Sequence, residues 1–206
     1  MTCVDETKFV TNVYNTIAEH FNDKRQSRWY WIDDFIENTN KDSTILDVGC
    51  GGGRNMKYSE RKFKGIDSSV KFVELCLAQD LDVIHGSMVS LPYEDSEFHH
   101  VLSIASFHHL STVKSRINCL SEMYRILKPE GTVLLSVWSK KQQQGSKRKF
   151  EYGDNYVPWI DKEGKTHQRY YYIFALDELT DLAKQTGFDI VKVSWDYGNE
   201  VLILQK

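Results

Sequence analysis

The spacing of apolar residues divides the chain near residue 40. Over the first forty residues apolar side chains recur at helical spacing, first Phe9, Val13, Ile17 and Phe21 and then Trp29, Ile32, Phe35 and Ile36. Residues three or four positions apart share one face of a helix. The pattern therefore predicts N-terminal helices within residues 1–40.

After residue 43 the pattern changes to short apolar runs separated by helical stretches. Five runs have the character of buried strands: residues 44–48, 63–67, 81–86, 100–105 and 131–138. Helical periodicity returns at 113–127 and 176–188, and residues 189–195 and 200–206 predict a closing hairpin. Strands that alternate with helices form a parallel sheet. We therefore predict an α/β, Rossmann-like fold with a mostly parallel seven-stranded sheet and a C-terminal antiparallel hairpin.

The chain is expected to form one domain, 1–206, with one long insertion. Its 206 residues suit a single α/β core, and no linker or internal repeat divides them. Residues 139–175 separate the fifth strand from the next helix and are too many for an ordinary connection. We expect this insertion to lie on the substrate side of the domain.

Composition and charge narrow the class of protein. The formal net charge of −3 gives no overall attraction to nucleic acid. The four cysteines are scattered without a C-x-x-C pair, so we expect neither a disulfide framework nor a metal site. No run approaches the roughly 18 apolar residues of a membrane span, and the first residues lack a signal-peptide profile. We expect no membrane association and a cytoplasmic location, with the nucleus as the alternative.

The strongest chemical motif is the glycine-rich segment ILDVGCGGGRN, residues 45–55. It follows the first predicted strand, where glycines let the backbone approach a ligand closely. Its spacing differs from the G-x-G-x-x-G of dinucleotide-binding domains, and no Walker lysine follows. Asp67 ends the second predicted strand, where a carboxylate can accept hydrogen bonds from both hydroxyls of a ribose.

In order and spacing, these elements resemble the class I S-adenosylmethionine (SAM) methyltransferases. The resemblance covers residues 44–138 and, with the last helix and hairpin, nearly the whole chain. It implies SAM as cofactor, with Gly49, Gly51 and Gly53 along its methionine end and Asp67 at its ribose. The other implied cofactor positions are Asp47, Cys50, Ser68, Ser87, Met88 and Ile104. Ser87 stands where many such enzymes carry an acid near the adenine, which leaves that contact to the serine or to the backbone at Met88.

Further stretches resemble one family, the eukaryotic methyltransferases that esterify the carboxymethyl group on a wobble uridine of tRNA. This family includes the fungal tRNA carboxymethyluridine methyltransferase and the methyltransferase domain of the human AlkB-type tRNA enzyme. The stretches are VYNTIAEHF (13–21) with Arg25 and Trp29, LSIASFHHLST (102–112), QGSKRKF (144–150), YVPW (156–159) and QRYYYIF (168–174). The resemblance implies that the carboxymethyl group of 5-carboxymethyluridine becomes a methyl ester, giving 5-methoxycarbonylmethyluridine.

The residue types in these stretches suit that chemistry. A carboxylate with a pKa near ~4 is already ionised at neutral pH, so its attack on the sulfonium methyl needs no general base. The site has to hold an anionic, flexible arm, for which arginine and histidine are suitable donors. The candidates are Arg25, His108, His109 and Arg169, with Tyr170 as a further donor or stacking group. An arginine among aromatic rings also has a purely structural interpretation, as a stacking partner.

A basic run inside the insertion is the expected tRNA contact. Lys140, Lys141, Lys147, Arg148 and Lys149 fall within ten residues that contain no acid. Such a run is either a solvated loop or a site for an anionic partner. In the second interpretation it follows tRNA phosphates, while exposed aromatic rings near Trp159 or Tyr170 stack on unpaired anticodon-loop bases. The family resemblance also implies a partner, a small zinc-binding activator subunit that forms a heterodimer with the enzyme.

The two adjacent histidines of SFHHLST, residues 106–112, have several possible roles. Zinc binding is disfavoured, because the other pair, His99 and His100, begins the same predicted strand roughly 30 Å away. Neighbouring strand residues face opposite sides of a sheet. We therefore expect one of His108 and His109 to face the substrate and the other to support the turn; the sequence leaves open which does which.

Three other interpretations remain compatible with the sequence. A Rossmann-like domain with another ligand would share the glycine loop. A SAM methyltransferase of small molecules, such as quinones, sterols or acids, would share the loop and Asp67 but would have no use for the basic insertion. A SAM-fold subunit without activity would explain the serine at Ser87.

Overall fold

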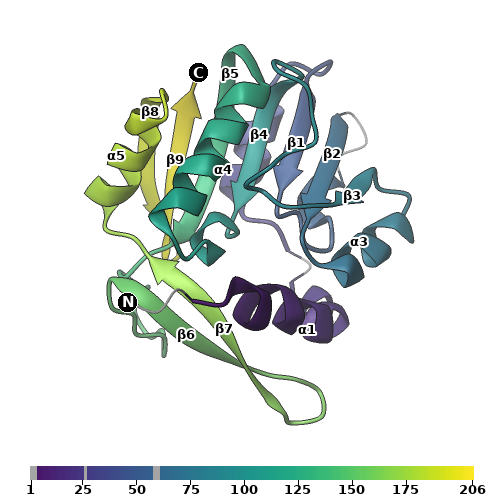
Figure 1. Cartoon of the computed structure of the whole chain (residues 1–206), viewed down its shortest axis with the longest axis vertical. Helices are drawn as coiled ribbons and strands as arrows, with labels where there is room; N and C mark the ends of the chain where they lie inside the picture. The colour runs from purple at the N-terminus through teal and green to yellow at the C-terminus, as the bar shows by residue number, and fades with distance from the viewer. Residues whose placement is uncertain (1–3, 26, 58–60) are drawn as a thin grey trace.

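A seven-stranded sheet forms the centre of the molecule (Figure 1). The computed structural model describes residues 4–25, 27–57 and 61–206. The strands of this sheet are β1 (Thr44–Val48), β2 (Lys62–Asp67), β3 (Val83–His85), β4 (Phe98–Ile104), β5 (Leu127–Trp138), β8 (Asp189–Asp196) and β9 (Asn199–Gln205). Their order is β3-β2-β1-β4-β5-β9-β8; the first five pair in parallel, and β9 is antiparallel to β5 and β8. The predicted α/β fold, with a mostly parallel sheet and a closing hairpin, is confirmed.

Apolar side chains cover both faces of this sheet, as buried parallel strands require. On one face Leu46 belongs to a large core with the helices α4 (Val113–Ile126) and α5 (Leu176–Gln185). On the other face its neighbour Ile45 packs with Ile32 and Ile36 of α2 (Tyr30–Glu37). The helix α3 (Val70–Leu77) packs with β3 through a third cluster that contains Cys76. Continuous apolar runs along the strands are thus explained by burial on two sides.

The ends of α4 and α5 follow from local chemistry. Thr112 is the N-cap of α4: its hydroxyl accepts the backbone N–H of Ser115 at 3.0 Å, within a reciprocal capping box. Gly187 has φ +98° just beyond α5, a left-handed conformation that suits glycine and ends the helix.

The carboxyl ends of the parallel strands meet at one edge of the sheet. The register places Asp47 of β1 opposite Gly65 of β2 and Leu102 of β4, while Asp67 lies opposite His85 at the end of β3. Open α/β sheets bind their ligands at this edge. The glycine loop, Asp67 and the histidine pair are therefore brought to one place.

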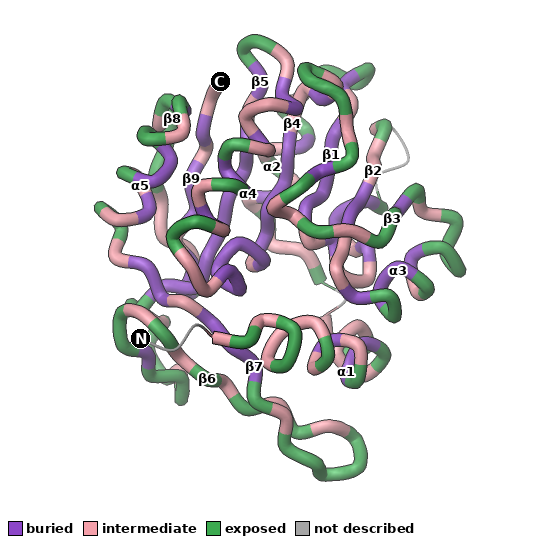
Figure 2. Tube along the Cα trace, viewed as in Figure 1, coloured by how far each residue is buried: buried purple, intermediate pink, exposed green. Residues whose placement is uncertain are grey.

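The first helix and the inserted segment lie beyond this edge (Figure 1). The N-terminal segment includes α1 (Asn12–Asp23) as well as α2, so helices are confirmed within residues 12–37. The insertion contains a two-stranded antiparallel sheet of β6 (Gly153–Ile160) and β7 (Thr166–Ile173), which the sequence pattern did not predict. Figure 2 shows β7 buried where it reaches the main domain, whereas the far end of the hairpin is exposed.

The described cysteines form no disulfide, and the described helices include no membrane span. Cys50, Cys76 and Cys119 are buried free thiols, and Cys3 lies outside the described residues. Over the described ranges, no helix has the length and apolar character needed to cross a bilayer.

Candidate active site

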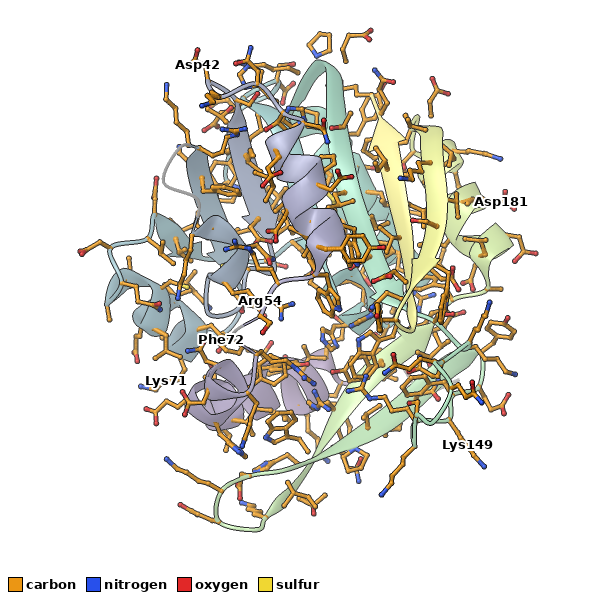
Figure 3. The ribbon with its side chains drawn as sticks, turned by 180° about the vertical axis from the view of Figure 1, so that it is seen from behind. Asp42, Arg54, Lys71, Phe72, Lys149 and Asp181 are labelled. Atoms are coloured by element: carbon orange, nitrogen blue, oxygen red, sulfur yellow. The ribbon has the colours of Figure 1, made fainter. Side chains whose placement is uncertain are left out.

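A cavity of about 900 Å³ opens at the carboxyl edge of the sheet. Its walls come from the glycine loop, the ends of β2 to β5, α1, the segment before α2, the basic run and the β8–β9 turn. Figure 3 labels two of the lining residues, Arg54 and Phe72, which lie toward the space between the sheet and α1. Most of the predicted site residues line it: Arg25, Gly49, Cys50, Gly51, Asp67, Ser68, Ser87, Met88, Ile104, His108, His109 and Arg148.

The glycine loop needs its glycines for two different reasons. Gly49 has φ +74°, and a Cβ there would lie 2.4 Å from the Cβ of Ser106, so no side chain fits. Gly51 has φ +53°, and a Cβ there would meet nothing within 4 Å. This open space faces the cavity and leaves the backbone free to approach a ligand. Gly53 does not line the cavity; a Cβ there would lie 2.3 Å from Leu81, so its role is to close the turn.

Asp67 combines loop support with a place in the cavity wall. Its two carboxylate oxygens accept the backbone N–H groups of Gly51 and Ser69, each at 2.8 Å. Burial raises the pKa of Asp67, and these backbone donors act in the opposite direction. A carboxylate has about four lone-pair sites, so two remain for the hydroxyls of a ribose. The position and the open Gly51 backbone fit the nucleoside and methionine parts of SAM.

Asp47 lies behind the glycine loop and does not line the cavity. It is fully buried, and its Oδ2 accepts the side-chain amide of Asn55 at 3.2 Å. Its Oδ1 has no hydrogen-bond partner among the described residues. Burial raises the pKa of Asp47 to about 7. The carboxylate charge therefore costs stability in the absence of a ligand, which is typical of a group kept for function.

Replacement of Asp47 should show this cost directly. Because its folded-state pKa lies above the usual value near ~3.9, the folded state holds the proton longer, and stability falls as pH rises from about 4 to about 7. Asp47→Asn should raise the free energy of unfolding by up to about 4 kcal/mol at pH 8 and by about 1.5 kcal/mol at pH 5, with a higher thermal midpoint in both cases. Thermal unfolding at both pH values checks this. A variant less stable than the wild type at pH 8 would contradict it.

The two histidines lie in a 3₁₀ turn, Phe107–His109, and not in the strand. Both rings are therefore on the cavity side, with centroids 4.7 Å apart, which corrects the expectation that neighbours face opposite ways. Nδ1 of His108 accepts the backbone N–H of Trp138 at 3.0 Å. Burial lowers the pKa of His108 well below 6.5, so the ring is neutral and carries its proton on Nε2. That nitrogen has no hydrogen-bond partner in the part of the chain that the structure describes.

His109 is instead held by a buried chain of hydrogen bonds. Its Nδ1–H donates to the carbonyl of Tyr170 at 2.7 Å, and burial lowers its pKa to about 4. Its Nε2 is therefore an acceptor, and the hydroxyl of Tyr14 donates to it at 3.1 Å. Tyr171 then donates to Tyr14 at 3.0 Å and accepts from Nη1 of Arg169 at 2.8 Å. Since both nitrogens of His109 are used, His109 supports the turn and His108 is the histidine with a free donor.

Arginines give the cavity a positive wall. Arg25, Arg28, Arg54 and Arg148 all line it, and Arg28 also pairs with Asp33 at 2.8 Å. Burial lowers the pKa of Arg54 to about 10, and the charges of Arg25 and Arg28 add to this shift. Among the described residues, no carboxylate forms an ion pair with Arg25, Arg54 or Arg148. Uncompensated arginines around one cavity favour an anionic ligand.

Sequence reasoning missed four of these cavity residues. Arg54 is part of the glycine-rich segment 45–55, and Arg28 directly precedes Trp29, which was named with the family-like stretch 13–21. Proximity to these two motifs was therefore a usable signal. Tyr14 and Tyr171 lie inside two of the stretches that carried the family resemblance. Their roles depend on contacts between segments 95 and 157 residues apart, which no local pattern contains.

Three predicted residues of β6 and β7 lie outside the cavity wall. Arg169 is 3% exposed and lies over the ring of Trp159, 5.0 Å from its centroid. Trp159 is half-buried and packs on Phe21. Tyr170 is fully buried, and its hydroxyl donates to Asp154 at 2.7 Å. The expected exposed ring at Tyr170 is thus wrong, because the ring of Tyr170 is fully buried; the side chains of Arg169 and Trp159 pack against Phe21 of α1.

The basic run divides into two parts. Arg148 reaches the cavity, with its guanidinium 4.5 Å from the centroid of the Trp138 ring. The lysines stay outside: Lys147 and Lys149 are exposed, Lys140 pairs with Glu151 at 2.6 Å and Lys141 lies over Trp195. Figure 3 shows Lys149 at the outer margin, away from Arg54. In the described residues, no three His, Cys, Asp or Glu side chains are grouped as metal ligands.

Comparisons with known proteins agree with this geometry. A family model described as a methyltransferase domain matches residues 46–135. The tRNA (carboxymethyluridine(34)-5-O)-methyltransferase of Schizosaccharomyces pombe is 30% identical, over 98% of this chain and 97% of its own length. The protein of the same name in Arabidopsis thaliana is 36% identical over 68% of this chain and 35% of its own.

A solved structure shows the same fold at low identity. It is a chain from the complex between the Haloferax volcanii Trm112 methyltransferase activator and a methyltransferase, with a TM-score of 0.68 and 16% identity over 95% of this chain and 96% of that chain. The predicted methyltransferase fold and its cofactor, SAM, are confirmed by these matches. Since the chain spans nearly the whole Schizosaccharomyces pombe relative at 30% identity, it belongs to the tRNA (carboxymethyluridine(34)-5-O)-methyltransferase family.

Proposed function

We propose that this protein transfers a methyl group from SAM to the carboxymethyl group of a wobble uridine in tRNA. The product is the methyl ester, 5-methoxycarbonylmethyluridine. The observation that carries the proposal is the cationic cavity wall beside the glycine loop, where Arg25 and Arg148 have no partner carboxylate among the described residues. The names of the relatives in Schizosaccharomyces pombe and Arabidopsis thaliana support the same substrate.

The proposed reaction needs positioning more than acid–base chemistry. SAM supplies a methyl group on a sulfonium; a carboxylate oxygen forms the new O–CH₃ bond while the S–CH₃ bond breaks, and no proton moves. Alignment of the reacting atoms can lower such a barrier by about 7–11 kcal/mol. His108 can donate from Nε2 to the carboxylate, and Arg25 can hold its charge. Both histidines are neutral, which agrees with a reaction that needs no general base.

The lysines outside the cavity are proposed to follow tRNA phosphates. Each lysine–phosphate contact adds about 0.7–0.9 to the slope of log affinity against log salt concentration. A double variant, Lys147→Gln with Lys149→Gln, should raise KM for tRNA and reduce that slope by up to roughly 2. KM for tRNA, measured at salt concentrations between about 50 and 200 mM, gives this slope. The same charge change at Lys184 and Lys192, both exposed outside this segment, is the control; equal slopes in both double variants would contradict the assignment.

A partner is part of the proposal. The structural neighbour from Haloferax volcanii was solved with the Trm112 methyltransferase activator, which supports a heterodimer with a small activator subunit here. Co-expression with such an activator, followed by co-purification and a comparison of methyl transfer with and without it, tests this part. Any zinc in the complex would be bound by the activator subunit and not by this chain.

Radiolabelled methyl transfer tests the substrate class. Label from SAM should enter bulk tRNA and not a small-molecule extract, and mild alkali should release it, because a methyl ester hydrolyses where a base-linked methyl does not. Label in quinones, sterols or small acids would support a different methyltransferase. No calorimetric SAM binding, with or without the activator, would remove the enzyme assignment.

A further inference from the structure

Two exposed tyrosines stand at the cavity wall although they come from distant parts of the chain. Tyr30 is the first residue of α2, and Tyr197 lies in the turn between β8 and β9. Their side chains are 66% and 64% exposed, yet both line the cavity. Large aromatic side chains that remain this exposed beside a binding cavity are candidates for ligand contact.

The backbone at Tyr197 is unusual for such a side chain. Tyr197 has φ +43° and Gly198 has φ +83°, so the two residues form a tight hairpin loop with both positions left-handed. Loops of this kind favour Asn-Gly or Gly-Gly, because a bulky residue is strained at positive φ. Strained side chains that persist in a fold gather at functional sites. A tyrosine at this position is presented to the cavity at a cost in stability.

The ring of Tyr30 is held in place rather than loosely solvated. Its hydroxyl donates to Oδ1 of Asp196 at 3.3 Å, and Oδ2 of Asp196 accepts the indole N–H of Trp31 at 2.9 Å. Tyr197 directly follows Asp196 in the chain, so this hydrogen bond brings the side chain of Tyr30 close to the β8–β9 turn that carries Tyr197. A ring fixed in advance loses little conformational entropy when a ligand stacks on it.

Acidic and basic side chains both surround these rings, with Asp196 against Tyr30. Arg28 and Arg54 line the same cavity, and the guanidinium of Arg54 lies 4.5 Å from the centroid of the Trp29 ring, one residue from Tyr30. Exposed aromatic rings combined with arginines are the chemistry that binds unpaired nucleotides, since bases stack on the rings and phosphates meet the cations.

We propose that Tyr30 and Tyr197 form a stacking platform for the unpaired bases next to the target uridine. This inference rests on the proposed function, because it assigns the neighbours of the same substrate nucleotide. It moves the predicted stacking site away from Trp159 and Tyr170, which lie outside the cavity wall, to Tyr30 and Tyr197, which line it. The platform binds any unpaired base, so it contributes affinity for an anticodon loop rather than sequence choice.

Binding of a fluorescent anticodon stem-loop RNA to the full chain tests the platform. Tyr197→Asn should weaken RNA binding about 5- to 150-fold, the range for loss of one stacked base. Its thermal midpoint should equal or exceed that of the wild type, because asparagine accepts the left-handed backbone. Tyr197→Phe should bind RNA like the wild type, and Tyr30→Leu should weaken binding like Tyr197→Asn. Tyr156→Ala, an exposed tyrosine of β6 outside the cavity, is the matched control.

A second RNA makes the result specific to stacking. With abasic residues on both sides of the wobble uridine, the wild type should bind as weakly as a Tyr30→Leu, Tyr197→Asn double variant, and that double variant should lose nothing more. Unchanged RNA affinity in both tyrosine variants would overturn the platform, as would an equal loss in Tyr156→Ala. Ester formation by the wild type is measured separately. If no ester forms while RNA binding persists, the proposed function is overturned, and the RNA-binding result still tests the platform.

Discussion

Asp67→Ala should weaken SAM binding by at least about 100-fold. The carboxylate accepts the backbone N–H groups of Gly51 and Ser69, and we propose that its remaining lone pairs accept hydrogen bonds from the cofactor. Hydrogen bonds to a charged group contribute about 1.5–3 kcal/mol each, so loss of two of them gives this factor. Calorimetric titration with SAM measures it, and thermal unfolding shows whether the variant stays folded.

Two further variants separate cofactor contact from folding. Asp67→Asn keeps the size of the side chain and removes the charge, so it should fold and still bind SAM more weakly than the wild type. Asp82→Ala replaces an exposed aspartate just before β3 and should change neither property. Normal SAM affinity in a folded Asp67→Ala would remove the assignment of Asp67 to the cofactor.

Arg25→Gln should lower kcat/KM for tRNA by about 100-fold and leave SAM affinity within a few-fold of the wild type. Arg25 lines the cavity without a carboxylate partner among the described residues, so a substrate carboxylate would complete its interactions. Loss of one charge-assisted interaction of about 2–3 kcal/mol corresponds to this factor. Steady-state kinetics with tRNA as the varied substrate measure it.

The neighbouring residue supplies the control for Arg25. Lys24→Gln removes one positive charge from an exposed position outside the cavity wall and should leave kcat/KM nearly unchanged. If SAM affinity fell together with tRNA kinetics in Arg25→Gln, Arg25 would belong to the cofactor site. Equal kinetic losses in both variants would instead indicate a general effect of charge.

The main fold could be predicted because strands buried on both faces of a sheet appear in the sequence as short apolar runs. Runs such as residues 44–48 and 131–138 are mostly apolar and do not alternate with polar positions, since neighbours such as Ile45 and Leu46 pack on opposite faces. The hairpin β6–β7 was missed for the opposite reason. Its first strand alternates half-buried and exposed residues over a small inner face, and its second strand is buried by the N-terminal helix and the histidine turn.

The cofactor side of the site was more predictable than the substrate side. Gly49, Gly51 and Asp67 lie within one strand–turn–strand unit, so their spacing along the chain determines how they lie relative to one another. His108, Tyr14 and Arg148 meet only through the tertiary fold. The 3₁₀ turn after β4 also places both histidines on the cavity side and not on opposite sides, because β4 ends at Ile104 and the alternation of a strand does not extend to them.

Methyl transfer to tRNA that carries 5-carboxymethyluridine at the wobble position is the most direct measurement of the proposed function. The wild type, assayed with and without the activator subunit, is incubated with SAM, and the nucleosides are separated and identified by mass spectrometry. We predict that 5-carboxymethyluridine disappears as 5-methoxycarbonylmethyluridine forms, and that Asp67→Ala and Arg25→Gln prevent it. A methyl group found on another atom or another nucleoside, with 5-carboxymethyluridine unchanged, would contradict the proposed function.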